Sequence, residues 1–143
     1  MIRELAAGET RLAFEAMRAL RPALASADEL VTRVDGTQRA EGYRLVAAFE
    51  DGEREAVAVA GFRLGHNLAW GRFLYVDDLS TLPSGRRRGH ARALMDWVVE
   101  EARRQGCDQV HLDSNTGPER AAAHRLYFNA GLIIASYHFA RRV

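Results

Sequence analysis

The chain has 143 residues, of which 48% are hydrophobic and 27% charged, and its net charge at pH 7 is +1. These values predict one soluble globular domain without a general affinity for nucleic acid or membranes. No apolar run approaches the roughly 18 residues of a membrane span, and the charged N-terminus lacks a signal core. Because Cys107 is the only cysteine, no intramolecular disulfide can form, and we expect a cytoplasmic protein.

The N-terminal third predicts a short strand followed by two helices. Met1–Leu5 has the pattern of a strand, and Glu9–Leu20 carries apolar residues at helical spacing until a proline ends it. Ser26 and Glu29 form a Ser-x-x-Glu capping box for a second helix that we expect to continue to about Val34.

The middle of the chain predicts three strands and a long helix. The strand candidates are Tyr43–Glu50, Ala56–Leu64 and Trp70–Leu79, separated by short polar or glycine-containing turns. Such turns favour an antiparallel meander. From Gly89 the apolar spacing becomes helical, and Gly106 ends that helix.

The C-terminal third predicts a strand, a helix and a final strand. Val110–Leu112 is a short apolar strand, and the long helix before it favours a parallel pairing with the third meander strand. Glu119–Ala130 is the last helix, with Gly131 after it, and Leu132–Phe139 is expected to be a strand. The order predicts an α/β chain with a mixed sheet and helices on both faces.

A loop rich in arginine separates the third meander strand from the long helix. The unpaired amides and the dipole at a helix start favour phosphate, and arginines strengthen that preference. The small residues Gly89 and Ala91 let the backbone approach a pyrophosphate. Neither the Walker pattern nor the dinucleotide fingerprint is present. The side chains around this point are Arg86, Arg87, Arg88 and His90.

The pattern Arg86-x-x-Gly89-x-Ala91 resembles the (Gln/Arg)-x-x-Gly-x-(Gly/Ala) signature of the GNAT superfamily, the acyl-CoA-dependent N-acyltransferases. Tyr75–Thr81 resembles the fourth strand of that family, and Ala122–Leu132 resembles its C-terminal helix. The resemblance is clear from about Phe73 to Phe139. It implies one N-acetyltransferase domain over residues 1–143, with a mostly antiparallel mixed sheet, a splayed parallel strand pair and helices on both faces.

The same resemblance implies acetyl-CoA as co-substrate, and no metal. The implied acetyl-CoA-binding residues are Leu79, Ser80, Thr81, Arg86, Arg87, Arg88, Gly89, His90, Ala91, Asn115 and Arg120. The backbone of the first three would pair with the pantetheine amides like an added strand. Arg120 stands where many family members have asparagine, and Asn115 is nearby but out of register. Arg120 would therefore meet a CoA phosphate or an acidic group of the substrate.

Three residues are candidates for the chemistry. In the resembled family a tyrosine at the position of Tyr127 lies near the CoA sulfur, and a phenol can protonate the leaving thiolate. Asp77 and Asp78 are the candidate bases. Because successive strand residues point to opposite faces, we expect one of them to line the cleft unless a bulge intervenes, and we prefer Asp78.

These observations predict an N-acetyltransferase that moves an acetyl group from acetyl-CoA to a primary amine of a small molecule, by direct attack in a ternary complex. The alternatives are an acyl-CoA sensor without turnover, a generic phosphate-binding module, and acetylation of a protein or aminoacyl-tRNA amine. Homodimers are common among relatives. The resemblance implies an acceptor site built from Met17–Val34 with Tyr43, Arg44, Phe62, Arg63 and His66. Arg18, Arg21 and Arg44 would either bind an acidic acceptor or lie solvated on the surface.

Overall fold

The computed structural model describes residues 1–143 and divides them into two compact units, Met1–Leu112 and Asp113–Val143. The first unit contains β1 (Ile2–Leu5), α1 (Phe14–Leu20), α2 (Ala27–Gly36), β2 (Tyr43–Ala48), β3 (Ala58–Asn67), β4 (Gly71–Thr81), α3 (His90–Arg104) and β5 (Gln109–Leu112). The second contains α4 (Ala121–Asn129), which follows a 3-10 turn at Pro118–Arg120. A single domain over the whole chain stays a prediction.

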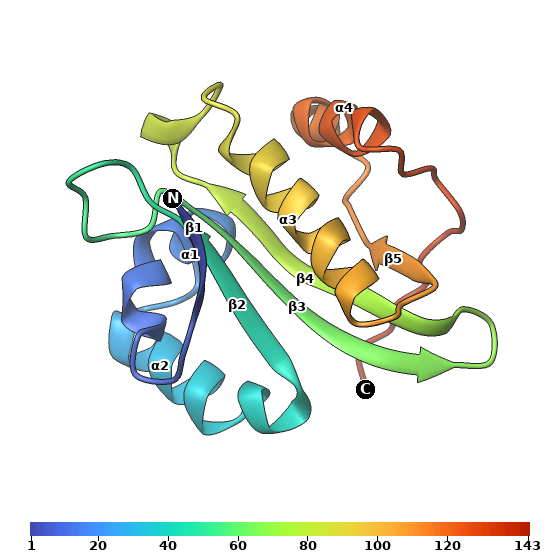
Figure 1. Cartoon of the computed structure of the whole chain (residues 1–143), viewed down its shortest axis with the longest axis horizontal. Helices are drawn as coiled ribbons and strands as arrows, with labels where there is room; N and C mark the ends of the chain where they lie inside the picture. Colours follow the sequence, from blue (N-terminus) through green and yellow to red (C-terminus); the bar gives the residue numbers. More distant parts are fainter. The chain divides into compact units, whose positions relative to one another are not determined.

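The first unit is built on a five-stranded mixed sheet in the order β1-β2-β3-β4-β5 (Figure 1). Strands β1 to β4 pair antiparallel, which confirms the predicted meander. Strand β5 pairs parallel with Phe73–Val76 of β4 after the crossover through α3, as predicted. No helix of the structure is both long and apolar enough to cross a membrane.

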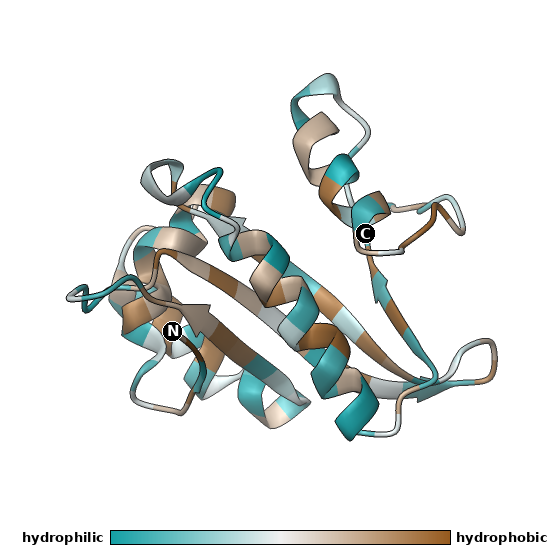
Figure 2. Cartoon of the chain, turned by 45° about the horizontal axis from the view of Figure 1, so that its top comes forward, coloured by the Kyte–Doolittle hydropathy of each residue, from teal (hydrophilic) through white to brown (hydrophobic).

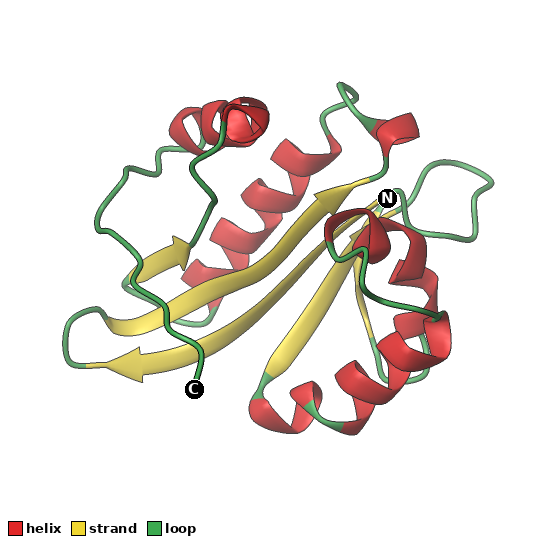
Figure 3. Ribbon diagram, turned by 180° about the vertical axis from the view of Figure 1, so that it is seen from behind, coloured by secondary structure: helices red, strands yellow, loops and turns green.

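Helices cover both faces of this sheet, which confirms the predicted fold class (Figure 3). On one face, residues of α1 and α2 such as Met17 and Leu30 pack against Leu45 of β2. On the other face, Leu94 and Val98 of α3 pack against the strands. Figure 2 shows hydrophobic stretches along the central strands and alternating hydrophobic and hydrophilic residues along α3. Strands buried on both faces need nearly continuous apolar sequence, whereas α3 needs it on one side only.

The N-terminal helices begin as the local sequence predicts, with one difference. The Ser26 side chain accepts a hydrogen bond from the Glu29 amide at 3.1 Å, which confirms the N-cap of α2. The Glu29 carboxylate accepts from the amide of Ala25 at 2.7 Å, one residue before the cap. The helix predicted over Glu9–Leu20 starts as a 3-10 turn at Thr10–Ala13 and becomes α-helical only in α1.

A β-bulge in β4 reverses which side chains face each side of the sheet. Gly61 of β3 pairs with Asp78 and the next residue, Phe62, pairs with Val76, so Asp77 is the extra residue. Val76 packs in the core on the α3 side, and so does Leu79, three residues later. In a regular strand these two residues would face opposite sides. The bulge therefore turns Asp78 away from α3.

The prediction of a final strand over Leu132–Phe139 is wrong. These residues follow α4 and adopt no regular structure, and Ile133, Ile134, Tyr137 and Phe139 are exposed. The run has strand-forming residues, but a strand exists only where a neighbour completes its hydrogen-bond ladder. The sheet ends at β5, and no strand pairs with this segment.

Candidate functional site

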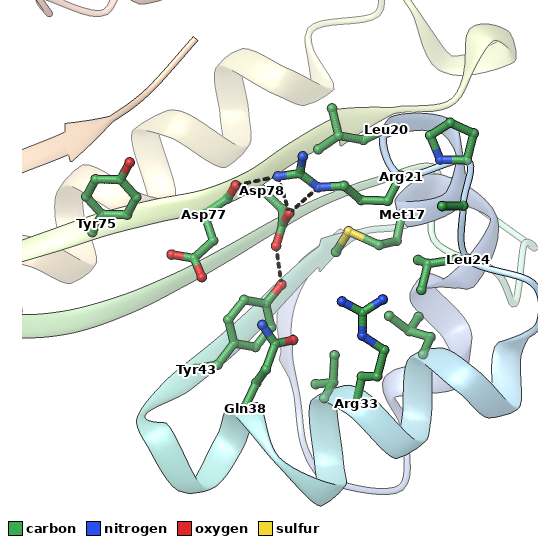
Figure 4. A pocket seen from close by; sticks show the side chains of 14 residues that line it. Met17, Leu20, Arg21, Leu24, Arg33, Gln38, Tyr43, Tyr75, Asp77 and Asp78 are labelled. Carbon is green, nitrogen blue, oxygen red and sulfur yellow. Dashed lines mark hydrogen bonds and ion pairs between the residues drawn. The ribbon is translucent and has the colours of Figure 1, made fainter. Parts of the chain in front are cut away.

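Two adjacent carboxylates at the bulge of β4 line one cavity in the first unit (Figure 4). We expected one of Asp77 and Asp78 to face the cleft unless a bulge intervened, and the bulge brings both there. Their side chains are 21% and 12% exposed, so both are partly shielded from solvent. Carboxylates in such a place can attract a cationic amine or receive a proton.

Each carboxylate is engaged by an arginine. Arg63 donates to Asp77 from two nitrogens, at 2.7 Å from Nη2 and 3.0 Å from Nε. Arg21 donates from Nε to Oδ1 of Asp78 at 2.9 Å, and from Nη2 to the backbone carbonyl of Asp77 at 3.0 Å. Arg63 comes from the neighbouring strand β3, whereas Arg21 is the residue that ends α1. The guanidinium of Arg21 thus bridges the two positions of the bulge.

Tyr43 fixes the second oxygen of Asp78. Its hydroxyl donates to Oδ2 at 2.8 Å, and only 2% of the residue is exposed. Burial raises the pKa of Tyr43 well above its ordinary value, and the Asp78 charge acts in the same direction. The phenol therefore remains a donor at neutral pH. A Cβ atom on Gly61 would lie 1.7 Å from the Tyr43 hydroxyl oxygen, so glycine at this position is what lets the ring approach the bulge.

The cavity beside these groups has a volume of about 770 Å³. Its apolar wall comes from α1, α2 and the segment between them, and includes Met17, Leu20, Leu24, Leu30 and Val34. Arg33, Gln38 and Tyr75 add polar groups to its lining. The structure therefore brings the Met17–Val34 region and Tyr43 together around one cavity, as the resemblance implied.

Other residues expected at the acceptor site lie elsewhere. Arg44 pairs with Glu101 of α3 and stacks over the ring of Phe62, so both belong to the α3 side of the sheet. His66 does not line the cavity, and Arg18 pairs with Glu15 on the outside of α1. A one-residue shift along a strand changes the face, which explains why Tyr43 and Arg44 separate.

The arginine-rich loop has an open backbone at the predicted phosphate site. Gly89 is the N-cap residue of α3 with a φ of +83°, and no atom would contact a Cβ there. Arg87 has a φ of +63°, and Arg86 and Arg87 are exposed. Ala91 lies in the first turn of α3. Open amides at the start of a fifteen-residue helix suit an anion.

Two of the predicted phosphate ligands are bound to a carboxylate that sequence inspection missed. Glu50 accepts from Nη1 of Arg88 at 2.6 Å and lies 3.0 Å from Nε2 of His90. These hydrogen bonds lower the pKa of Glu50, which keeps its side chain charged at neutral pH. Glu50 lies 38 positions before Arg88, so no local pattern linked the two residues.

The last residues of β4 have a strand on one side only. Leu79, Ser80 and Thr81 pair with β3, whereas β5 pairs with β4 no further than Val76. The Thr81 hydroxyl is buried without a hydrogen-bond partner. No other strand of the sheet pairs along this edge, as the predicted backbone pairing with pantetheine requires.

In the second unit, Tyr127 is half-buried on α4. Burial raises the pKa of Tyr127, and Arg120 opposes that rise. Arg120 is the N-cap residue of α4. Asn115 is exposed, and its backbone carbonyl oxygen lies 2.9 Å from Nε2 of His124. Gly131 ends α4 with a φ of +87°, as predicted.

Comparison with known proteins decides the family. The model of the acetyltransferase (GNAT) family matches residues 11–131. The chain belongs to this family. The uncharacterised N-acetyltransferase YhdJ of Bacillus subtilis (strain 168) is 32% identical over 112 residues, which cover 78% of this chain and 76% of that protein. The resemblance seen in the sequence is thereby confirmed, and this GNAT chain is an acyltransferase.

Solved structures share the fold of this GNAT chain. An acetyltransferase of Trypanosoma brucei has 21% identity and a TM-score of 0.80, covering 100% of this chain and 99% of its own. The aminoglycoside N-acetyltransferase AAC(6')-Iy, solved in complex with CoA, has 20% identity and a TM-score of 0.82, covering 100% and 93%. No group of three or more histidine, cysteine or acidic side chains is arranged to hold a metal ion.

Sequence inspection placed Arg21 and Tyr43 at the expected acceptor site but missed their contacts with Asp78 and the role of Gly61 in this GNAT chain. The one available signal was Gly61, because glycine inside a strand often marks a bulge or a close approach. The pairing of Arg21 with Asp78 spans 57 positions and has no sequence signature.

Proposed function

We propose that this acetyltransferase moves an acetyl group from acetyl-CoA to a primary amine of a small molecule, by direct attack in a ternary complex. The observation that carries the proposal is the cavity beside Asp77 and Asp78, which combines two carboxylates with an apolar wall. A cavity of about 770 Å³ has the size of a small-molecule site. AAC(6')-Iy, whose structure was solved with CoA and whose name gives an aminoglycoside acceptor, supports this class of reaction.

In the proposed reaction the amine nitrogen bonds to the thioester carbonyl carbon, and the carbon–sulfur bond breaks. The acceptor binds as an ammonium and loses two protons, one before the attack and one as the amide forms. The leaving thiolate gains one proton and the other passes to solvent, so the products are an amide, a thiol and a proton. Asp78 receives the proton from the amine, directly or through water, while Asp77 helps to hold the ammonium. Tyr127 donates to the thiolate, a role that its family resemblance suggests and that its protonated phenol supports.

Acetyl-CoA is held by main chain and by cations in this proposal. The amides around Gly89 and Ala91 bind the pyrophosphate, with Arg86, Arg87, Arg88 and His90 around it. The backbone of Leu79, Ser80 and Thr81 pairs with pantetheine, and the Leu79 amide polarises the thioester carbonyl. Asn115 and Arg120 are the remaining proposed contacts. A cytoplasmic location stays a prediction.

The test is calorimetric titration of the protein with acetyl-CoA, with CoA and ATP as controls. We expect saturable binding of acetyl-CoA and CoA but not of ATP, followed by thiol release in a screen of amines. Binding of ATP alone would support a generic phosphate-binding module. If acetyl-CoA binds but no small, peptide or aminoacyl-tRNA amine causes CoA to be released, the acyl-CoA sensor is favoured.

Tyr127→Phe tests the thiolate step by removing one hydroxyl. We expect kcat to fall by about 100-fold, in the range of general acid catalysis, with little change in the dissociation constant of acetyl-CoA. Steady-state kinetics and calorimetry measure the two effects separately. Tyr137→Phe is a matched control, because Tyr137 is exposed in the segment after α4. Normal turnover of Tyr127→Phe would remove this residue from the mechanism.

A further inference from the structure

The cavity is lined by two carboxylates, Asp77 and Asp78, and by two arginines, Arg21 and Arg33, which do not pair one to one. Each carboxylate is paired with one arginine, but Arg21 at Asp78 is 53% exposed whereas Arg63, which donates twice to Asp77, is 29% exposed, so the Asp78 partner is the one more open to exchange. When an acceptor amine binds Asp78, Arg21 loses its carboxylate partner. Arg21 and Arg33 then have no acidic partner among the residues that line the cavity.

The Arg21 guanidinium stands where an acceptor ammonium would bind. It donates both to the Asp78 carboxylate and to the Asp77 carbonyl, a pair of acceptors that equally suits a primary ammonium. Asp78 is only 12% exposed and is held by buried Tyr43, so this anionic group is fixed. Arg21 is 53% exposed, so its guanidinium can leave Asp78 for solvent, whereas the shielded Asp78 carboxylate needs a cation in its place.

Arg33 supplies a second charge on the α2 side of the cavity. Its guanidinium points from α2 into the space below Met17 and Leu24 (Figure 4). Its partner Glu29 lies 3.6 Å away, beyond hydrogen-bond distance, and the other oxygen of Glu29 accepts from the Ala25 amide. Arg33 thus retains donors for an anionic group, and a displaced Arg21 adds more.

We infer that the acceptor is a small zwitterion, whose primary amine replaces the Arg21 guanidinium at Asp78 and whose carboxylate or phosphate binds Arg33. The apolar wall between the two groups contacts the carbon chain of the acceptor. The inference rests on the proposed function and narrows its substrate class. The inference also predicts that polycationic amines are poor acceptors, because Arg33 would repel a second ammonium group.

The test uses three series of acceptors that differ only at the far end: aminocarboxylates, plain alkylamines and diamines, each with about two to six carbons. Affinity for the protein saturated with CoA is measured by calorimetry, and kcat/KM by thiol release. We expect the best aminocarboxylate to bind and react about tenfold better than its alkylamine, as one charge-assisted contact provides, and better still than its diamine. An amine carrying phosphate in place of the carboxylate shows which anion is preferred.

Arg33→Glu sharpens the result by reversing one charge. We expect this variant to bind the aminocarboxylate at least about tenfold more weakly and the diamine more tightly than the wild type does. Arg18→Glu, on the outside of α1, is the control and should leave the order of affinities unchanged. A wild-type preference for alkylamines or diamines, or no binding by any series, would overturn the inference. If acetyl-CoA itself fails to bind, the proposed function fails, whereas a higher kcat/KM for alkylamines or diamines than for aminocarboxylates refutes the zwitterion alone.

Discussion

The cavity at the β4 bulge and the arginine-rich loop both pair arginine with carboxylate, but they differ in what holds the groups in place. At the bulge, Asp78 is held by Tyr43, which is buried against Gly61. At the loop, Arg88 is 58% exposed and its contact with Glu50 lies at the surface. The first arrangement is built into the core, whereas the second joins two surface segments.

This difference indicates how each region meets its ligand. A fixed carboxylate can orient an amine without paying to order the site. A surface pair can exchange its carboxylate for a phosphate at little cost, because exposed ion pairs contribute little to stability. Substitutions at the bulge should therefore change catalysis and folding, whereas substitutions in the loop should change affinity.

Replacement of Asp78 gives the largest expected effect. Asp78→Asn keeps the shape of the side chain but removes its charge, so we expect kcat/KM to fall by about 100-fold. Asp77→Asn should lower kcat/KM by less than about tenfold, because the Asp77 carboxylate is already paired with Arg63 in the wild type. Steady-state kinetics with one acceptor compares the two variants. Equal losses would show that the bulge does not distinguish the two carboxylates.

The packing behind Asp78 is tested by Gly61→Ala. The new methyl group would collide with the Tyr43 hydroxyl at 1.7 Å, so we expect a loss of about 1–3 kcal/mol in the free energy of unfolding, as in other overpacked cores. Gly36→Ala is the control, because a Cβ there meets no atom within 4 Å. Urea unfolding measures both. Wild-type stability for Gly61→Ala would mean that Tyr43 is not fixed as described.

The loop is tested by Gly89→Val, which places a branched side chain where the pyrophosphate is proposed to approach. We expect acetyl-CoA affinity to fall about tenfold or more, an effect of roughly 1.4 kcal/mol per factor of ten. Backbone strain alone is controlled by Gly52→Val, since Gly52 has a φ of +80° against +83° for Gly89 and equally open surroundings. If both variants bind acetyl-CoA alike in calorimetry, the loop is not the site.

The smallest effect is expected from Glu50→Gln. Loss of this carboxylate releases Arg88 and His90 for phosphate, so acetyl-CoA should bind up to about fivefold more tightly, in keeping with the small worth of surface ion pairs. Glu53→Gln is the matched control, because Glu53 lies with Glu50 in the segment between β2 and β3. Weaker binding by Glu50→Gln would show instead that Glu50 positions these two cations.

Local sequence determined much of the fold and the family. The three meander strands with their turns, the Ser26 cap and the glycine after α3 are short-range signals that the structure confirms. The segment around Gly89, together with Tyr75–Thr81 and Ala122–Leu132, indicated the family, because each matches a short stretch typical of its members. The final strand over Leu132–Phe139 failed because a strand needs a neighbour that its own sequence does not specify.

Tertiary structure alone decided the shape of the candidate site. The sequence named Asp77 and Asp78 but left open whether both face the cleft, since that depends on the register against Gly61 and Phe62. The Arg21–Asp78 and Arg88–Glu50 pairs join residues 57 and 38 positions apart. Local propensity sets which element forms, but the partners of a charged side chain are fixed only when the sheet and its helices pack together.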